Sequence, residues 1–200
     1  MSLDIVCFSC QGIDSTTGTS QVLIQLNGCL HFLRYHHRKT EAVATRPAEL
    51  IGSTAMLKDV DDLAVTEDLA GGSDLICCVP TWNTAADSMR SGTAWDSHLE
   101  LIPDLQMAGR FVAIVGLGDS LSYPAYFCDA MEELYTAFLQ SGATIVGKVS
   151  PSGYIYSESK SLVNGLFCGL PLDEDSEPDL TDERLISWLA QLRREAPRMF

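Results

Sequence analysis

The run LICCV at Leu75–Val79, stopped by Pro80, decides the fold class of this chain. Five apolar residues in succession, without an alternating polar face, are typical of a strand that is buried on both sides in a parallel sheet. The run FVAIV at Phe111–Val115 repeats the pattern and is followed by Gly116 and Gly118. Two such strands are typical of an α/β domain with a parallel sheet.

Strand-like and helix-like segments alternate around these two runs. The same periodicity predicts further strands at Cys29–Leu33 and Thr144–Gly147, and helices within Thr40–Ile51, Tyr126–Gln140 and Leu185–Leu192. This order implies a doubly wound, five-stranded parallel sheet with right-handed crossovers and helices on both faces. Ligands of such sheets bind beyond the carboxyl ends of the central strands, so the loops after the first three strands are the first place to look.

Residues 1–27 stand outside this alternation. They are rich in Ser, Thr, Gly and Gln around Ile13–Gln21, and they lack both the charged start of a signal peptide and the arginine-rich character of a transit peptide. We therefore interpret 1–27 as an N-terminal extension that docks on the domain or on a partner, and 28–200 as the domain. A disordered tail is the alternative.

The charge balance restricts the partners. Thirteen basic and twenty-seven acidic residues give a formal net charge of −14, which repels a phosphodiester backbone and excludes nucleic acid as an expected partner. No apolar run approaches the roughly 18 residues of a membrane span, so we expect a protein that does not span a bilayer. An acidic surface suits docking on a basic redox protein or a larger redox complex, although the charge could equally serve solubility alone.

The cysteines and histidines favour neither disulfides nor a metal. Seven cysteines are an odd number, and several lie in apolar runs, which indicates reduced thiols in a cytosol-like compartment. Cys7 and Cys10 have the spacing of a redox motif without the surrounding βαβ pattern. His36 and His37 are adjacent, so they point apart on a regular element, and no third ligand is evident. We expect no metal site.

Two segments beside the buried strands carry a resemblance to a known family. The first is PTWNT at Pro80–Thr84, continued by RSGTAWD at Arg90–Asp96, and the second is GLGD at Gly116–Asp119, continued by Tyr123-Pro124. They resemble the two flavin loops of long-chain flavodoxins of the algal and cyanobacterial type, and the resemblance covers more than half of the chain. It implies a flavodoxin-like fold, FMN as the cofactor, and electron transfer without catalytic residues.

The resemblance also implies roles for individual residues. Trp82 and Tyr123 would flank the flavin ring, and Asn83 and Asp119 would lie among its polar contacts. Two aromatic faces in an acidic pocket lower the potential of a flavin. The alternative is that both aromatic side chains only pack the loops. The other residues that the resemblance assigns to FMN are Thr40, Thr81, Thr84 and Gly118.

The phosphate loop departs from the family pattern. The register puts it at Tyr35–Thr40, where flavodoxins have hydroxyl residues and a glycine whose N–H groups wrap the phosphate. Here the bulky run YHHRK precedes Thr40. Ser15–Ser20 (STTGTS) has a hydroxyl-glycine pattern but precedes the wrong segment, and the side-chain charge of Arg38 and Lys39 is a third way to hold a phosphate.

Two functions are therefore open. The altered phosphate loop, together with Ala85 and Ser122 in place of glycines, favours an accessory or structural subunit that docks on a photosynthetic electron-transfer complex such as photosystem I, with FMN binding weakened or lost. The alternative is a functional FMN-binding one-electron carrier between photosystem I and a reductase. Either function predicts a location in a plastid stroma or a cytoplasm, or at the periphery of a photosynthetic membrane.

Overall fold

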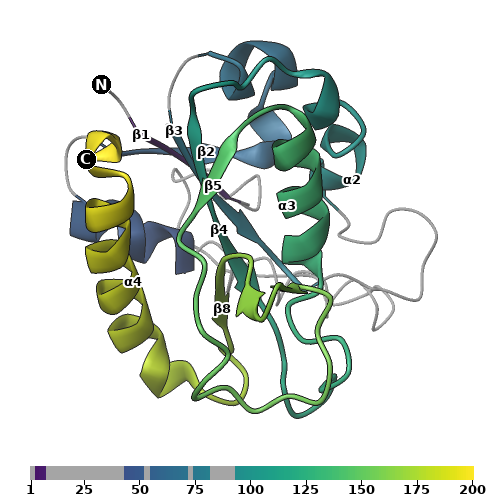
Figure 1. The fold of residues 1–200 in the computed structure, drawn as a ribbon, viewed down its shortest axis with the longest axis vertical. Helices are drawn as coiled ribbons and strands as arrows, with labels where there is room; N and C mark the ends of the chain where they lie inside the picture. Colours follow the sequence, from purple (N-terminus) through teal and green to yellow (C-terminus); the bar gives the residue numbers. More distant parts are fainter. Residues whose placement is uncertain (1–2, 8–42, 52–54, 72–73, 82–92) are drawn as a thin grey trace, which may run out of the picture.

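A parallel sheet forms the centre of the molecule (Figure 1). The computed structural model describes residues 3–7, 43–51, 55–71, 74–81 and 93–200. The strands of the main sheet lie in the order β2-β1-β3-β4-β5, and the short β8 pairs with the end of β4. Their bounds are β1 Leu3–Cys7, β2 Ala55–Asp59, β3 Asp74–Val79, β4 Phe111–Leu117, β5 Thr144–Val146 and β8 Leu170–Leu172. The predicted flavodoxin-like α/β fold is confirmed, with β8 added to the five strands.

The first strand corrects the predicted domain boundary. Leu3 lies opposite Ala55 of β2 on one side and opposite Asp74 of β3 on the other, so β1 is hydrogen-bonded on both edges. The assignment of 1–27 to an extension outside the domain is therefore wrong for Leu3–Cys7. Residues 8–42 separate this short run from the described helix at 43–51, which hides it from the alternation seen in sequence. The predicted strand at Cys29–Leu33 lies outside the described residues.

The two predicted buried strands, β3 and β4, are present and divide the core into two layers. On β3, Leu75 and Cys77 face one apolar cluster and Ile76 faces the other, as the two-residue period of a strand requires. The first cluster packs on α3 (Ala130–Gln140) and the second on α4 (Thr181–Glu195), which lie on opposite sides of the sheet in Figure 1. This arrangement explains why neither strand shows a polar face.

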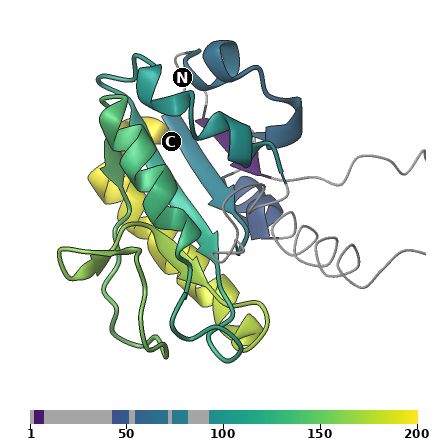
Figure 2. The same ribbon diagram turned by 90° about the vertical axis from the view of Figure 1, so that its right-hand side faces the viewer.

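The helices lie where the sequence predicts them, except that one begins later than predicted. The described residues 43–51 are helical, and α4 contains the predicted Leu185–Leu192. The helix predicted from Tyr126 begins only at Ala130 and runs alongside the strands (Figure 2). Gly142 ends it with a φ of +88°, as predicted. The short elements are η1 Val60–Asp62, η2 Val65–Leu69, α2 Trp95–His98, η3 Ile102–Asp104, β6 Leu162–Val163, β7 Leu166–Phe167, η4 Pro178–Leu180 and η5 Pro197–Met199.

The described residues bear on the predictions about membrane spanning and about reduced cysteines. Within them, no helix is long and apolar enough to cross a membrane. The cysteines at 77, 78, 128 and 168 are free and buried. Burial raises the pKa of the Cys168 thiol to about 12, and that of Cys128 is also raised well above its usual value. The thiols of Cys128 and Cys168 are therefore protonated packing groups at neutral pH.

Candidate functional site

The candidate site lies at the carboxyl edge of the sheet. The chain passes from β1 to β2 on one side and then crosses to β3 on the other, so the strand order reverses between β1 and β3. Ligands of open α/β sheets bind outside the carboxyl ends of the strands at such a reversal, and flavodoxin-like sheets are a known instance with FMN there. The segments that follow the carboxyl ends of the strands are therefore the candidates for ligand binding.

Thr81 ties the ends of two central strands together. It follows β3 and Pro80, is half-buried, and its Oγ1 donates a hydrogen bond to the carbonyl of Leu117 at 3.1 Å. Leu117 is the last residue of β4. This bond holds the start of the first predicted flavin loop against the start of the second.

Gly118 allows the second loop to fold back on itself. Its N–H donates to the carbonyl of Leu172 at 2.9 Å. A Cβ on Gly118 would lie 2.6 Å from a ring carbon of Phe127 and 2.7 Å from Sγ of Cys128. A side chain at 118 would overlap these two residues, so Gly118 shapes the loop. Its predicted role in cofactor binding stays a prediction.

Asp119 closes a tight turn that presents Tyr123. Its Oδ1 accepts a hydrogen bond from the N–H of Ser122 at 2.8 Å, and its carbonyl accepts one from the N–H of Tyr123 at 2.9 Å. The backbone at Tyr123 is therefore fixed, while its side chain is 45% exposed. An aromatic ring held out by a rigid turn is suited to stacking on a planar ligand.

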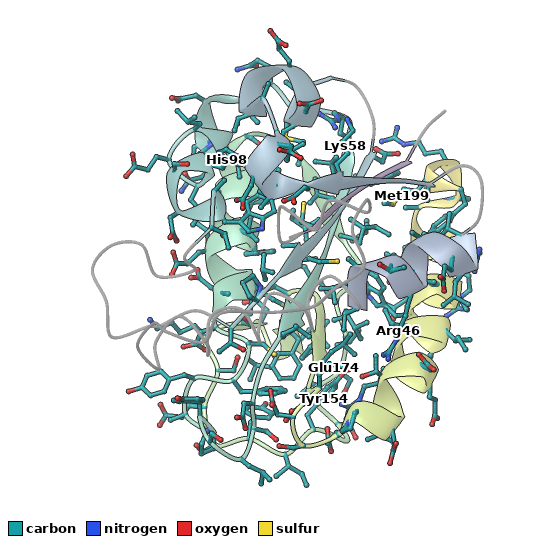
Figure 3. All side chains as sticks on the ribbon, turned by 180° about the vertical axis from the view of Figure 1, so that it is seen from behind. Arg46, Lys58, His98, Tyr154, Glu174 and Met199 are labelled. Atoms are coloured by element: carbon teal, nitrogen blue, oxygen red, sulfur yellow. The ribbon has the colours of Figure 1, made fainter. Side chains whose placement is uncertain are left out.

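Asp173, which the sequence did not single out as a site residue, anchors this turn. Its side chain is fully buried, and its Oδ2 accepts a hydrogen bond from the N–H of Ser120 at 2.9 Å. Oδ1 accepts two more, from the N–H groups of Asp175 and Ser176. Its neighbour Glu174 forms an ion pair with Arg46 at 3.3 Å (Figure 3), so the segment that anchors the turn also contacts the helical residues 43–51.

A second set of hydrogen bonds connects residues 127–129, at the end of the loop, to residues 159–161. Ser159 Oγ donates to the carbonyl of Phe127 at 2.6 Å, and Ser161 Oγ donates to that of Cys128. The N–H of Lys160 donates to Oδ1 of Asp129 at 2.8 Å. Burial raises the pKa of the Asp129 carboxyl, a shift that the hydrogen bond from Lys160 opposes. Residues 118–129 are thus held from two sides.

The remaining predicted site residues lie outside the described residues. These are Thr40, Trp82, Asn83 and Thr84. The predicted site residues that the structure describes are Thr81, Gly118, Asp119 and Tyr123, and the predicted pairing of Trp82 with Tyr123 stays a prediction. In the described ranges, no group of three His, Cys, Asp or Glu side chains could hold a metal ion.

The two candidate phosphate segments, Ser15–Ser20 and Tyr35–Thr40, lie outside the described residues. Both follow β1, which ends at Cys7, and precede the described helical residues 43–51 in the sequence. Which of them would hold a phosphate therefore stays a prediction.

Comparison with known proteins identifies the family. The sequence pattern of the flavodoxin family matches residues 37–188. This chain belongs to the flavodoxin family. A flavodoxin from Nostoc sp. is 40% identical over 158 residues, which cover 78% of this chain and 90% of that protein. Flavodoxin 1 of Salmonella typhimurium is 35% identical over 159 residues, covering 78% and 87%.

A solved flavodoxin has the same fold. The flavodoxin of Fusobacterium nucleatum, bound to flavin mononucleotide, superimposes with a TM-score of 0.68 at 22% identity, covering 97% of this chain and 98% of that one. The flavodoxin resemblance inferred from the two loops is thus confirmed. The family match begins at residue 37, after β1. None of these relatives supports the predicted accessory role or the loss of FMN.

Proposed function

We propose that this flavodoxin-family protein binds FMN and carries single electrons. The observation that supports the proposal best is the turn at 119–123, which holds Tyr123 half-exposed beyond the carboxyl end of β4. This is the edge where flavodoxin-like sheets bind their cofactor. The named relatives from Nostoc and Salmonella are flavodoxins, at identities of 40% and 35% over most of the chain.

The described residues fit the ring portion of FMN. Tyr123 offers an aromatic face, and the Asp119 carboxylate lies in the same turn, where it accepts a hydrogen bond from the N–H of Ser122. Thr81 and Gly118 fix the two loop starts. FMN would supply the ability to take up and release one electron at a time. The protein itself would bind the ring, orient it and keep it in an acidic surrounding, without a catalytic side chain.

A matched pair of variants tests this proposal. Tyr123 and Tyr126 lie three residues apart and are 45% and 50% exposed. Tyr123→Ala should weaken FMN binding by about tenfold to a hundredfold, because stacking on a planar ring contributes on the order of 1–3 kcal/mol. Tyr126→Ala should change it less than threefold. Equal effects of the two variants on the FMN dissociation constant would remove the main support for the site.

A second candidate function is the accessory subunit that docks on a photosynthetic electron-transfer complex such as photosystem I. The observation that favours it is the bulky run YHHRK that precedes Thr40. Phosphate capture by backbone N–H groups needs small residues, so this run is unlike the loop that wraps a phosphate. The net charge of −14 suits a basic partner in either function.

Salt dependence of docking separates the two functions. Binding of the full chain to isolated photosynthetic membranes should weaken steeply between low and high salt if charge alone holds a transient carrier. A resident subunit should remain bound, since buried apolar contacts are not screened. A truncation that removes residues 1–26 would not separate the two functions, because it would also delete β1. Salt-resistant binding by protein that takes up no FMN would favour the accessory role.

A further inference from the structure

A groove on the α4 side of the molecule is not used by the proposed FMN site. It has a volume of about 370 Å³ and lies between α4 and residues 149–154. None of the predicted FMN residues lines it. Tyr154, at the end of this groove, lies beside the first turns of α4 (Figure 3). A hollow of this size is within the range that takes a small ligand or a side chain of a partner.

The floor of the groove is apolar and rigid. Trp188 and Leu170 line it and are each only 2% exposed. The indole of Trp188 is fixed by a hydrogen bond from its Nε1–H to the carbonyl of Gly147 at 2.7 Å. The apolar surface that remains open to an occupant includes Leu180, which also lines the groove and is 38% exposed. Because the buried floor is already fixed, an occupant would not have to order it on binding.

The one cation on the groove wall is already engaged within the described part of the chain. Nη2 of Arg184 lies 2.7 Å from Oε2 of Glu177 and donates to the carbonyl of Gly153 at 3.3 Å. Its guanidinium also lies over the ring of Tyr154, with Cζ 4.3 Å from the centroid. Glu177, Gly153 and Tyr154 therefore fix the position of Arg184, whose Nη1 is buried without a hydrogen-bond partner among the described residues.

The acid on the same wall is not engaged. Glu183 lines the groove, is exposed, and has no ion pair or hydrogen bond with any residue that the structure describes. Lys148, whose carbonyl accepts a bond from Gln191 at the other end of the groove, holds its own ammonium 4.8 Å from the Tyr135 ring centroid. The unmatched charge of the lining is thus negative.

We propose that this groove receives a lysine side chain of a basic protein partner. The aliphatic stem would lie on Leu180, above the buried floor of Trp188 and Leu170, and the ammonium would reach Glu183. The hydroxyls of Ser150 and Ser187 would be further acceptors. A lysine combines an apolar stem with a compact charge that has three donors, which matches an apolar floor with separate acceptors at its rim. The contact involves none of the predicted FMN residues, so it is expected whether or not FMN is bound.

The experiment uses the Trp188 indole N–H as a local reporter. Its resonance in a ¹H–¹⁵N spectrum of the full chain is assigned with Trp188→Phe, and the protein is titrated with N-acetyl-lysine-N-methylamide. The matched neutral probe is N-acetyl-norleucine-N-methylamide, which keeps the stem and lacks the ammonium. We expect a saturable shift with the lysine probe and at least fivefold weaker binding of the norleucine probe.

Two variants with the same change in charge locate the effect. Glu183→Gln should weaken binding of the lysine probe about fivefold, as expected for loss of a partly exposed ion pair. Asp179→Asn, an exposed acid that does not line the groove, should change it less than twofold. Absence of a saturable shift, equal binding of the two probes, or equal losses in the two variants would overturn the proposal.

Discussion

Replacing the buried carboxylate of Asp173 should loosen the whole Tyr123 turn. Asp173→Asn can keep Oδ1 on the N–H groups of Asp175 and Ser176, but it then turns its own N–H₂ toward the N–H of Ser120. A hydrogen bond to a charged group is worth about 1.5–3 kcal/mol, and two buried donors that face each other add a further penalty. The opposite amide orientation loses two bonds instead of one. We expect a loss of about 3 kcal/mol in the free energy of unfolding.

The expected loss is measurable in two ways. For a chain of this length, about 3 kcal/mol corresponds to a fall in Tm of roughly 6–12 °C, and urea denaturation gives the free energy directly. Because Ser120 lies between Asp119 and Tyr123, the affinity for FMN should fall by about tenfold or more. The control is Asp179→Asn, which removes the same charge from an exposed position. A loss below about 1 kcal/mol, or no change in FMN affinity, would refute this account of the turn.

Three further predictions concern the same loop. Gly118→Ala should cost about 1–3 kcal/mol of stability in urea denaturation, because its Cβ would overlap the Phe127 ring; an unaltered midpoint would show that the loop yields freely. Thr81→Val should cost about 1 kcal/mol in the same assay through loss of the bond to the Leu117 carbonyl, and a stabilised variant would contradict that role. Burial raises the pKa of Asp129, so the folded protein keeps this proton over a pH range where the unfolded chain has released it, and stability falls as pH rises through that range. Between about pH 4 and pH 7, wild type should therefore lose stability relative to Asp129→Asn, and a constant difference would contradict it.

The fold was predictable from the sequence where burial on both faces of the sheet produces a continuous apolar run. The runs at Leu75–Val79 and Phe111–Val115 are apolar throughout because helices cover both faces of the sheet. Leu3–Cys7 belongs to the same sheet, but it is short and contains Asp4, so its sequence lacks the continuous apolar run of a strand that is buried on both faces.

The site was predictable only in its local part. The loop residues Gly118, Asp119 and Tyr123 follow a buried strand, and their order in the chain carries the resemblance to flavodoxins. Asp173 could not be found this way, because its partner Ser120 lies 53 residues away. The late start of α3 has a similar cause, since Cys128 adopts a φ of +54° and its carbonyl is bound by Ser161. Helical periodicity does not reveal such long-range bonds.

The most direct test of the carrier function is the amount of FMN that the protein holds. The purified chain would be saturated with FMN, separated from free FMN by gel filtration, and examined for flavin absorbance against protein concentration. For an FMN-dependent electron carrier we expect a yellow protein with one FMN per chain. Its dissociation constant for FMN should lie below about 1 μM, equivalent to a binding free energy of roughly −8 kcal/mol. A colourless protein whose addition leaves the fluorescence of free FMN unchanged would contradict it and leave the accessory role as the better explanation.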